Sequence, residues 1–224
     1  MSECMSLNRD ADYFIISDAH VGSHSVNDCC NYQKLIPFLE EVLLTTKAVL
    51  ILNGDFFEYM KFFKSNVIKK NKKIYSILEE LKKQNRVIHL KGNHDYSSSN
   101  KTELIINNSI IIMHGDIFEK TLISFMRLNY IIHLFISFIE KLFRTNINCI
   151  FKKILHYDRM KKRGEKIEKK ATEYIKKQKK YKAIIVGHTH TPGTNHIYYN
   201  CGSFTNNNSD YIEISNNKIY LKSY

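Results

Sequence analysis

The sequence predicts an α/β domain built around a largely parallel sheet. Two observations predict it: five short apolar runs rich in Ile and Val, and helical patterns between the early runs. Nearly continuous apolar runs of this length are typical of strands buried on both faces. Alternation of strands with helices favours parallel pairing, because parallel neighbours need a crossover connection. The runs lie at residues 13–17, 48–53, 86–90, 109–113 and 183–186.

Two segments between the first three runs carry apolar residues at helical spacing. Residues 32–44 and 71–84 are therefore predicted helices. The end of the chain differs, because 196–200, 210–215 and 218–223 have the pattern of short strands. The turn Asn216–Asn217 joins the last two. We expect these strands to add antiparallel members to a second sheet.

Length and composition bound the organisation of the chain. With 224 residues and 43% apolar content it can bury one sizeable core, which predicts a single domain over 1–224. The five cysteines form no CxxC pair, so neither a disulfide framework nor a thiolate zinc site is indicated. A reducing compartment fits this usage. No apolar core of signal-peptide length begins the chain, so a cytoplasmic location is expected.

Residues 117–182 interrupt the alternation and predict a helical lid insertion. The part 117–143 is long and very apolar, although Arg127, His133 and Glu140 argue against a membrane-spanning helix. The part 161–182 holds eleven basic and three acidic residues, which accounts for +8 of the net charge of +12. Such charge suits anionic partners, namely phosphate esters, nucleic acid or an acidic membrane surface. The competing interpretations are a buried helix pair and a solvated helix face.

Each apolar run is followed at once by a polar cluster. The carboxyl ends of parallel strands lie along one edge of a sheet, where ligands bind, so we expect these clusters to converge. Glycines precede several of them, as expected where strand-end turns need positive φ. The clusters read SDAH, NGDFFE, KGNHD, MHGD and GHTH, and half of the ten histidines fall in them.

The ligand types in these clusters indicate metal chemistry. Two carboxylates, one amide and four imidazoles exceed what one ion accommodates and suit two divalent ions about 3.5–4 Å apart, bridged by a carboxylate. Nitrogen and oxygen ligands without thiolate suit Mn, Fe, Co or Zn, of which we favour Mn. Two dications less two carboxylates leave about +2, which favours a phosphate group and a water-derived hydroxide nucleophile.

The pattern DAH…GD…GNHD…H…GHTH over residues 18–190 resembles the signature of the calcineurin-like metallophosphoesterases. The resemblance implies a four-layer αββα sandwich of two sheets between helices. It implies that Asp18, His20 and His190 hold the first metal. It implies that Asn93, His114 and His188 hold the second metal and that Asp55 bridges the two. His94 would contact the phosphoryl oxygen or protonate the leaving group. Asp95 would orient His94.

Within that family the chain is similar to the UDP-2,3-diacylglucosamine pyrophosphatases. The similarity rests on GDFFEYM, MHGD, YYNCGS and a helical insertion between HGD and GHTHTP. It implies a lipid-linked nucleotide pyrophosphate as substrate and an insertion that covers acyl chains. One departure is His94, where those enzymes commonly have arginine. Four further residues are predicted to line the pocket or to meet phosphate or nucleotide, namely His24, His156, Lys161 and Lys162.

Three other functions were weighed against this one. The first alternative is a phosphatase or phosphodiesterase of soluble nucleotides or phosphoproteins. A nuclease would fit the basic charge, but the basic segment lacks the interleaved aromatics of a single-strand groove, so no nucleic-acid partner is expected. A non-catalytic scaffold is disfavoured because no ligand position is missing. The apolar and basic insertion predicts peripheral association with anionic membranes, and the oligomeric state stays open.

Overall fold

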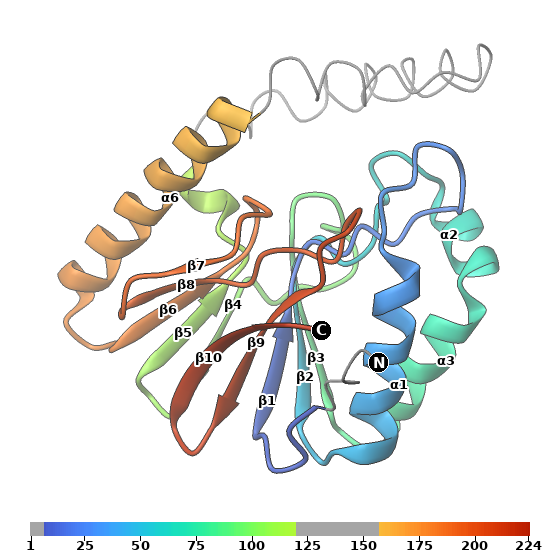
Figure 1. The fold of residues 1–224 in the computed structure, drawn as a ribbon, viewed down its shortest axis with the longest axis horizontal. Coiled ribbons are helices and arrows are strands. Elements are labelled where there is room, and N and C mark those ends of the chain that lie inside the picture. Colours follow the sequence, from blue (N-terminus) through green and yellow to red (C-terminus); the bar gives the residue numbers. More distant parts are fainter. Residues whose placement is uncertain (1–6, 120–156) are drawn as a thin grey trace, which may run out of the picture.

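A computed structural model describes residues 7–119 and 157–224 of the chain. In these residues two five-stranded mixed sheets lie between helices (Figure 1). The first sheet has the order β10-β9-β1-β2-β3. Its strands are β1 (Tyr13–Ile16), β2 (Val49–Asn53), β3 (Val87–Leu90), β9 (Asp210–Ser215) and β10 (Lys218–Ser223).

The second sheet has the order β4-β5-β6-β8-β7. Its strands are β4 (Glu103–Ile106), β5 (Ile110–Met113), β6 (Ala183–Val186), β7 (Gly193–Thr194) and β8 (Tyr198–Asn200). The three central strands β5, β6 and β8 are parallel, and the edge strands β4 and β7 are antiparallel to their neighbours. In the first sheet β1, β2 and β3 are parallel. Each sheet thus contains three adjacent parallel strands that end in polar loops.

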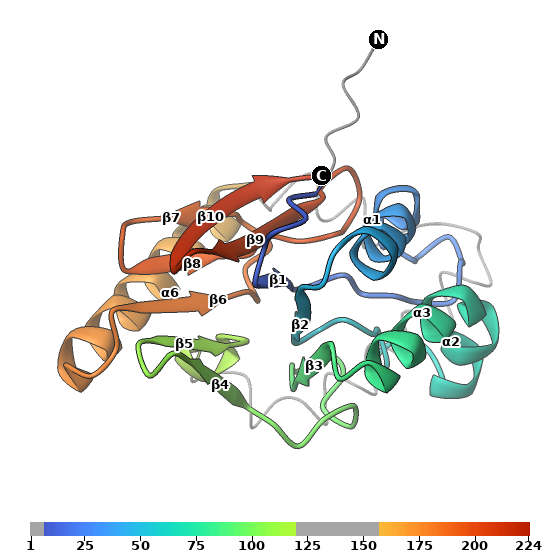
Figure 2. The same ribbon diagram turned by 90° about the horizontal axis from the view of Figure 1, so that it is seen from below.

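Helices cover the outer face of each sheet. The first sheet is covered by α1 (Tyr32–Thr45), α2 (Lys64–Lys70) and α3 (Lys72–Lys83), and the second by α6 (Tyr157–Gln178). A short 3-10 helix, η1 (Asp116–Phe118), follows β5. Figure 2 shows the two helical layers on opposite sides of the sheets. The described residues therefore form the four layers α, β, β and α.

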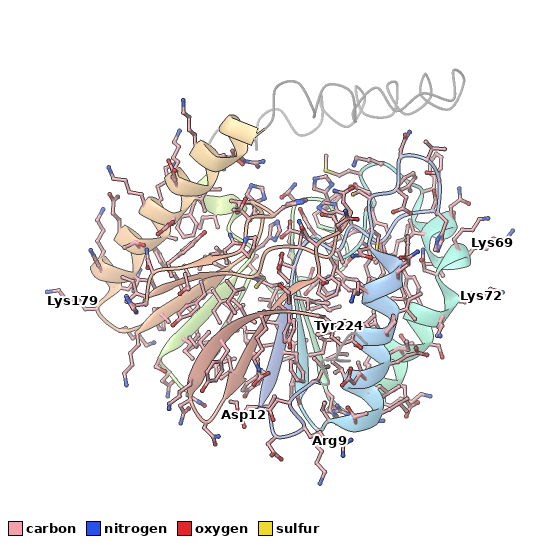
Figure 3. All side chains as sticks on the ribbon, in the orientation of Figure 1. Arg9, Asp12, Lys69, Lys72, Lys179 and Tyr224 are labelled. Atoms are coloured by element: carbon pink, nitrogen blue, oxygen red, sulfur yellow. The ribbon has the colours of Figure 1, made fainter. Side chains whose placement is uncertain are left out.

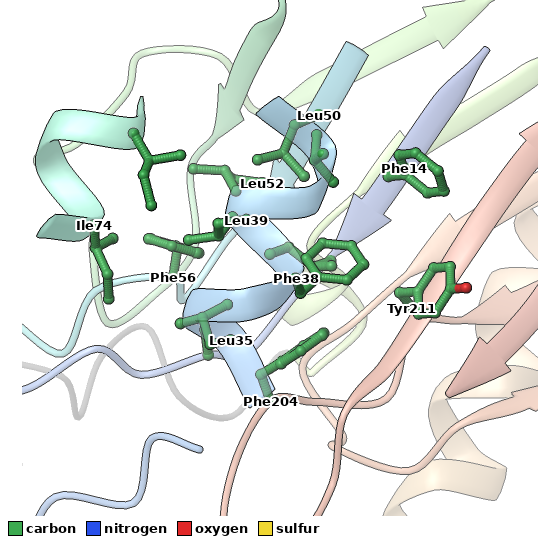
Figure 4. Close-up of a cluster of buried hydrophobic side chains, with 14 of the residues drawn as sticks. Phe14, Leu35, Phe38, Leu39, Leu50, Leu52, Phe56, Ile74, Phe204 and Tyr211 are labelled. Carbon is green, nitrogen blue, oxygen red and sulfur yellow. The ribbon is translucent and has the colours of Figure 1, made fainter. Parts of the chain in front are cut away.

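Alternation along the strands divides the apolar side chains into three layers of core. In β5, Ile110 and Ile112 face the first sheet, whereas Ile111 and Met113 face α6. In β1, Ile15 faces the second sheet and its neighbours face the helices. Figure 4 shows the helix-side cluster, where Phe38 of α1 lies among the rings of the C-terminal part of the chain. Burial on both faces explains why these strands read as continuous apolar runs.

The five predicted apolar runs all form strands, and both predicted helices form α1 and α3. Four of the described elements were not predicted: β4, β7, α2 and η1 are short and lack a clear period. One expectation was wrong. The strands 210–215 and 218–223 belong to the first sheet, because β9 pairs antiparallel with β1. Of the three C-terminal segments, only 198–200 joins the second sheet, as β8.

The C-terminal part of the predicted insertion is a layer of the sandwich itself. Ile167, Ala171 and Ile175 of α6 are buried against β5, β6 and β8. Their spacing places them on one helical face, and the lysines of α6 occupy the others. The lid helix expected at 121–143 lies outside the described residues. Within 117–182, η1 and α6 are thus positioned by the core.

Basic side chains are distributed over both flanks of the molecule. Lys179 follows α6 on one side, and Lys69 and Lys72 lie on the opposite helical layer (Figure 3). Basic side chains therefore lie on both helical layers, although 161–182 carries +8 of the net charge of +12. Among the described residues no helix is long and apolar enough to cross a bilayer.

The packing of α6 predicts the effect of truncating its apolar face. Ile167→Ala should lower the free energy of unfolding by about 2–4 kcal/mol, because the cavity would lie between α6 and the second sheet. The matched change Lys169→Ala, on the exposed face of the same helix, should alter it by less than about 0.5 kcal/mol. Urea unfolding in the presence of a chelator measures both. If both variants changed the free energy of unfolding equally and only slightly, α6 would not be packed on the second sheet.

Candidate metal centre

Three groups of potential ligand atoms lie at the carboxyl ends of the parallel strands. Within each group the nitrogen and oxygen atoms fall within 4.8 Å of one another. The groups are Asp18, His20 and His190; Asp55, His114 and His188; and His20, Glu58 and His94. Residues that are 170 positions apart in the chain, such as His20 and His190, meet because both sheets end at the same side. The convergence thus takes place across two sheets rather than along a single one.

The first group is built on Asp18. Its Oδ2 accepts hydrogen bonds from the backbone N–H of His188 at 2.7 Å and from the hydroxyl of Ser17 at 2.6 Å. Its Oδ1 is buried and makes no hydrogen bond, with Nε2 of His190 3.3 Å away. Nε2 of His20 lies 3.2 Å from Nε2 of His190. One carboxylate oxygen is thus anchored, and the other faces two imidazole nitrogens.

The second group repeats this arrangement around Asp55. Its Oδ1 accepts the backbone N–H of His94 at 2.7 Å, and its Oδ2 lies 3.2 Å from Nε2 of His114. Oδ1 of Asn93 lies 3.2 Å from the same nitrogen. The ring of His188 joins this group, whereas that of His190 joins the first. The neighbouring histidines of GHTH therefore face different groups, and a bridging role for Asp55 stays a prediction.

The backbone at these positions is unusual. Positive φ is uncommon outside glycine, and it is concentrated at functional sites where the surroundings enforce it. The turns after β1, β2 and β6 place ligand residues themselves in the left-handed region. The residues are Asp18 (53°), His20 (47°), Asp55 (51°), His188 (68°) and His190 (57°).

Two glycines permit the close approach of these turns. A Cβ on Gly92 would lie 2.2 Å from Oδ1 of Asp55, and one on Gly187 would lie 1.9 Å from Oγ of Ser17. Neither glycine has positive φ, unlike Gly54 at +78°. Positive φ, which was expected of the glycines in these turns, is thus found at Gly54. Gly92 and Gly187 are needed because a side chain at either position would collide with a neighbouring loop.

Hydrogen bonds on the far side of the rings orient the imidazoles. Nδ1 of His114 lies 2.9 Å from the backbone oxygen of Asn53, and Nδ1 of His20 lies 2.9 Å from Oε2 of Glu58. Both partners only accept, so each Nδ1 carries a hydrogen. Nε2 of each ring then faces its group as a potential ligand atom. Such second partners are typical of histidines that bind metal ions.

Opposite charges stabilise one another throughout the centre. Burial disfavours the ionised form of Asp18, but the imidazoles of His190 and His114 hold its pKa well below its ordinary value. The pKa of Asp55 is lowered in the same way by His114 and His94. Burial opposes protonation of His114, but the carboxylates of Asp55 and Asp18 raise its pKa to about 10. Without cations, imidazolium protons therefore balance the buried carboxylates.

His94 and Asp95 have different surroundings from those expected. The carboxylate that contacts Nδ1 of His94 is that of Glu58, at 2.7 Å. Asp95 instead accepts backbone N–H groups from Gly92 and from the segment after β2, and it lies 2.9 Å from Nε2 of His89. The role of orienting His94, expected for Asp95, is thus filled by Glu58. Asp95 holds the loop that carries Asp55.

Two residues that the sequence did not single out contact a predicted ligand. Oε2 of Glu119 lies 2.8 Å and Nη2 of Arg163 lies 2.9 Å from Nε2 of His188. Glu119 and Arg163 also form an ion pair. The hydrogen bond with His188, and then that with Arg163, lower the pKa of Glu119 to about 2 although burial opposes this. No motif marks either residue, because both lie inside the predicted insertion 117–182 and outside the five polar clusters. Glu58 is part of the quoted GDFFE and could have been found there.

The four residues predicted to contact substrate are placed differently. His24 stacks on Tyr32 with ring centroids 4.0 Å apart, and its Nε2 lies 3.0 Å from Oδ1 of Asn71. His156 lies outside the described residues. Lys161 and Lys162 lie in the first turns of α6, where Lys162 is exposed. Contact of these residues with substrate stays a prediction.

A buried pair of Asp/His groups at the carboxyl edge of an αββα sandwich defines a metal-dependent hydrolase of the metallophosphoesterase class. Residues 13–192 match the calcineurin-like phosphoesterase family, Metallophos. The chain therefore belongs to this family of metal-dependent phosphoester hydrolases, which use a binuclear metal centre. A comparison with curated proteins gave no match.

The donor set fits two divalent cations. The anchored carboxylates, the orphaned Oδ1 of Asp18 and the outward Nδ1 hydrogen bonds all direct ligand atoms inward. Asp55→Ala should remove at least one cation and nearly all turnover, because the second group would lose its anionic member. Metal analysis of purified wild type and variant tests this expectation. Full metal content in active Asp55→Ala would contradict it.

Cation binding should release protons. His114 has a pKa of about 10 and the pKa of His20 is also raised, so both rings hold protons that a cation must displace. Affinity for Mn²⁺ should therefore rise with pH and level off only near about pH 10, where His114 has lost its proton. Calorimetric titration in two buffers of different ionisation enthalpy counts the protons. Binding without proton release would refute this charge balance.

Proposed function

We propose that the enzyme hydrolyses the pyrophosphate of a lipid-linked nucleotide, such as a UDP-diacylglucosamine, while associated with an anionic membrane. The proposal narrows the phosphoester hydrolysis that the family defines. It rests on one observation above all: a described residue on each side of segment 120–156 contacts a histidine of the metal centre. Glu119 precedes this segment, Arg163 follows it, and both contact His188.

The sequence between these contacts is apolar. Residues 117–143 carry seventeen apolar and five charged side chains. Such a composition suits a segment that binds acyl chains, and we assign it this role for a substrate whose phosphates lie at the metal centre. A phosphatase of small soluble substrates has no need of such a segment at this position.

Exposed apolar side chains at the same edge support contact with a membrane. Phe63 is 69% exposed, Tyr96 is 60% exposed and Ile117 is 57% exposed. They follow β2, β3 and β5, so they share the edge that carries the metal centre. Basic residues such as Lys64 accompany them. Buried apolar area and attraction to anionic lipid would then both contribute to binding.

The side chains of the centre supply the remaining chemistry. Bound divalent cations would supply Lewis-acid activation of the phosphate and of the attacking water. His94 would present Nε2 to the phosphate or to the leaving group, since its Nδ1 is bonded to Glu58. Arg163 would offer its guanidinium to a second phosphate, for which its planar donors are suited.

The test compares substrates with and without acyl chains. At about 0.8 kcal/mol per buried methylene, a few buried methylenes should raise kcat/KM by more than about tenfold over the same nucleotide pyrophosphate lacking them. Phe63→Ser should weaken binding to anionic vesicles, and salt should weaken it further. The matched control is Leu44→Ser. The side chain of Leu44 is 77% exposed and lies at the end of α1, before β2.

The same experiment can support the alternative. If the acyl chains do not change kcat/KM and the protein ignores anionic vesicles at low salt, the enzyme acts on soluble nucleotides or phosphoproteins. His94, where lipid-linked pyrophosphatases commonly have arginine, is the residue that favours this alternative.

A further inference from the structure

Glu58 contacts two imidazoles with one buried carboxylate. Its Oε2 lies 2.9 Å from Nδ1 of His20, and its Oε1 lies 2.7 Å from Nδ1 of His94. The side chain is 1% exposed. The two rings meet edge to face with centroids 4.6 Å apart. One ring belongs to the first ligand group, and the other is the predicted contact of the phosphoryl group.

The position of Glu58 is fixed by the backbone around it. Its N–H donates to the backbone oxygen of Val21 at 3.0 Å, which ties the loop after β2 to the loop after β1. The preceding residues, Phe56 and Phe57, donate their N–H groups to Asp95. The carboxylate is therefore held in place from both sides, so it can define the orientation of flexible rings.

A buried carboxylate of this kind needs its partners. Taking an ionised carboxylate out of water costs several kcal/mol unless charges and hydrogen bonds compensate. Burial opposes ionisation, but His94 and Lys61 keep the pKa of Glu58 well below its ordinary value. Nζ of Lys61 lies 3.2 Å from Oε2. Glu58 is thus an acceptor on both oxygens, and both imidazoles must donate from Nδ1.

We infer that Glu58 is a positioning residue that couples the first metal ligand to the phosphate-contacting histidine. By accepting from Nδ1 of both rings, it leaves the lone pair of Nε2 on His20 for a cation and fixes the ring of His94 beside it. The inference uses the roles assigned above to His20 and His94, but it does not depend on a lipid-linked substrate.

Glu58→Gln tests the inference because an amide cannot satisfy both rings. Its single oxygen accepts from one Nδ1–H, while its NH₂ group only donates, so the other ring must place its hydrogen on Nε2. A displaced hydrogen on His20 should weaken Mn²⁺ binding by about 10- to 100-fold. A displaced hydrogen on His94 should lower kcat on an aryl phosphate diester with a poor leaving group.

The control is Glu213→Gln, which also changes a buried carboxylate with a lysine partner. Glu213 lies 2.7 Å from Lys222 and has no imidazole partner among its described contacts. It should leave cation affinity and kcat as in wild type. Nitrogen NMR of the zinc-loaded proteins reports the hydrogen position on each imidazole without any substrate. In wild type and in Glu213→Gln, the imidazole hydrogen should be on Nδ1 of both His20 and His94.

The His94→Ala background separates the two effects. There, any loss of Mn²⁺ affinity caused by Glu58→Gln should persist, and any loss of kcat caused through His94 should vanish. The inference is overturned if both imidazoles keep Nδ1–H in Glu58→Gln and its Mn²⁺ affinity and kcat equal those of Glu213→Gln. Acyl-chain preference is irrelevant to each readout, so failure of the proposed substrate would leave this result intact.

Discussion

The burial of two carboxylates at one edge of the fold is the constraint on which the rest of the site depends. Asp18 and Asp55 are almost completely buried, and ionised carboxylates in such places require compensation. Each has one oxygen anchored by a backbone N–H, from His188 and His94 respectively. The other oxygen faces imidazoles. Either protons or divalent cations can therefore balance the charge, and the site exchanges one for the other.

The backbone conformation follows from this constraint. A carboxylate can accept a backbone N–H from another loop only if two turns approach closely, and Gly92 and Gly187 leave the space for it. Left-handed conformations at Asp18 and His188 then turn the side chains towards the centre. Such conformations cost about 1–3 kcal/mol each and persist where packing over-determines them. The three layers of buried apolar side chains supply that packing.

The sequence predicted the strands well, because a strand that is buried on both faces appears in the sequence as a continuous apolar run. A single exception does not obscure such a run. The sequence also predicted that the polar clusters converge at one edge, since each cluster follows such a run directly. From the sequence, β9 and β10 were assigned to the wrong sheet. The local pattern of a strand does not show which other strand it pairs with. Glu119 and Arg163 were missed, because their proximity to His188 arises only when η1 and α6 pack on the second sheet.

The assignment of Asp95 shows where a motif stops being informative. GNHD places Asp95 next to His94, and the resemblance to the calcineurin-like metallophosphoesterases implied that Asp95 orients His94. Successive residues in a tight loop point in different directions, however, so Asp95 turns towards backbone N–H groups while His94 turns towards Glu58. Three consecutive residues of this loop thus have different partners: Asn93 faces the second ligand group, His94 contacts Glu58, and Asp95 accepts the backbone N–H of Asp55. A change at any one of them acts on the others through the loop, so the consequences of replacing His94 by arginine, as in lipid-linked pyrophosphatases, depend on whether Glu58 accepts the new side chain.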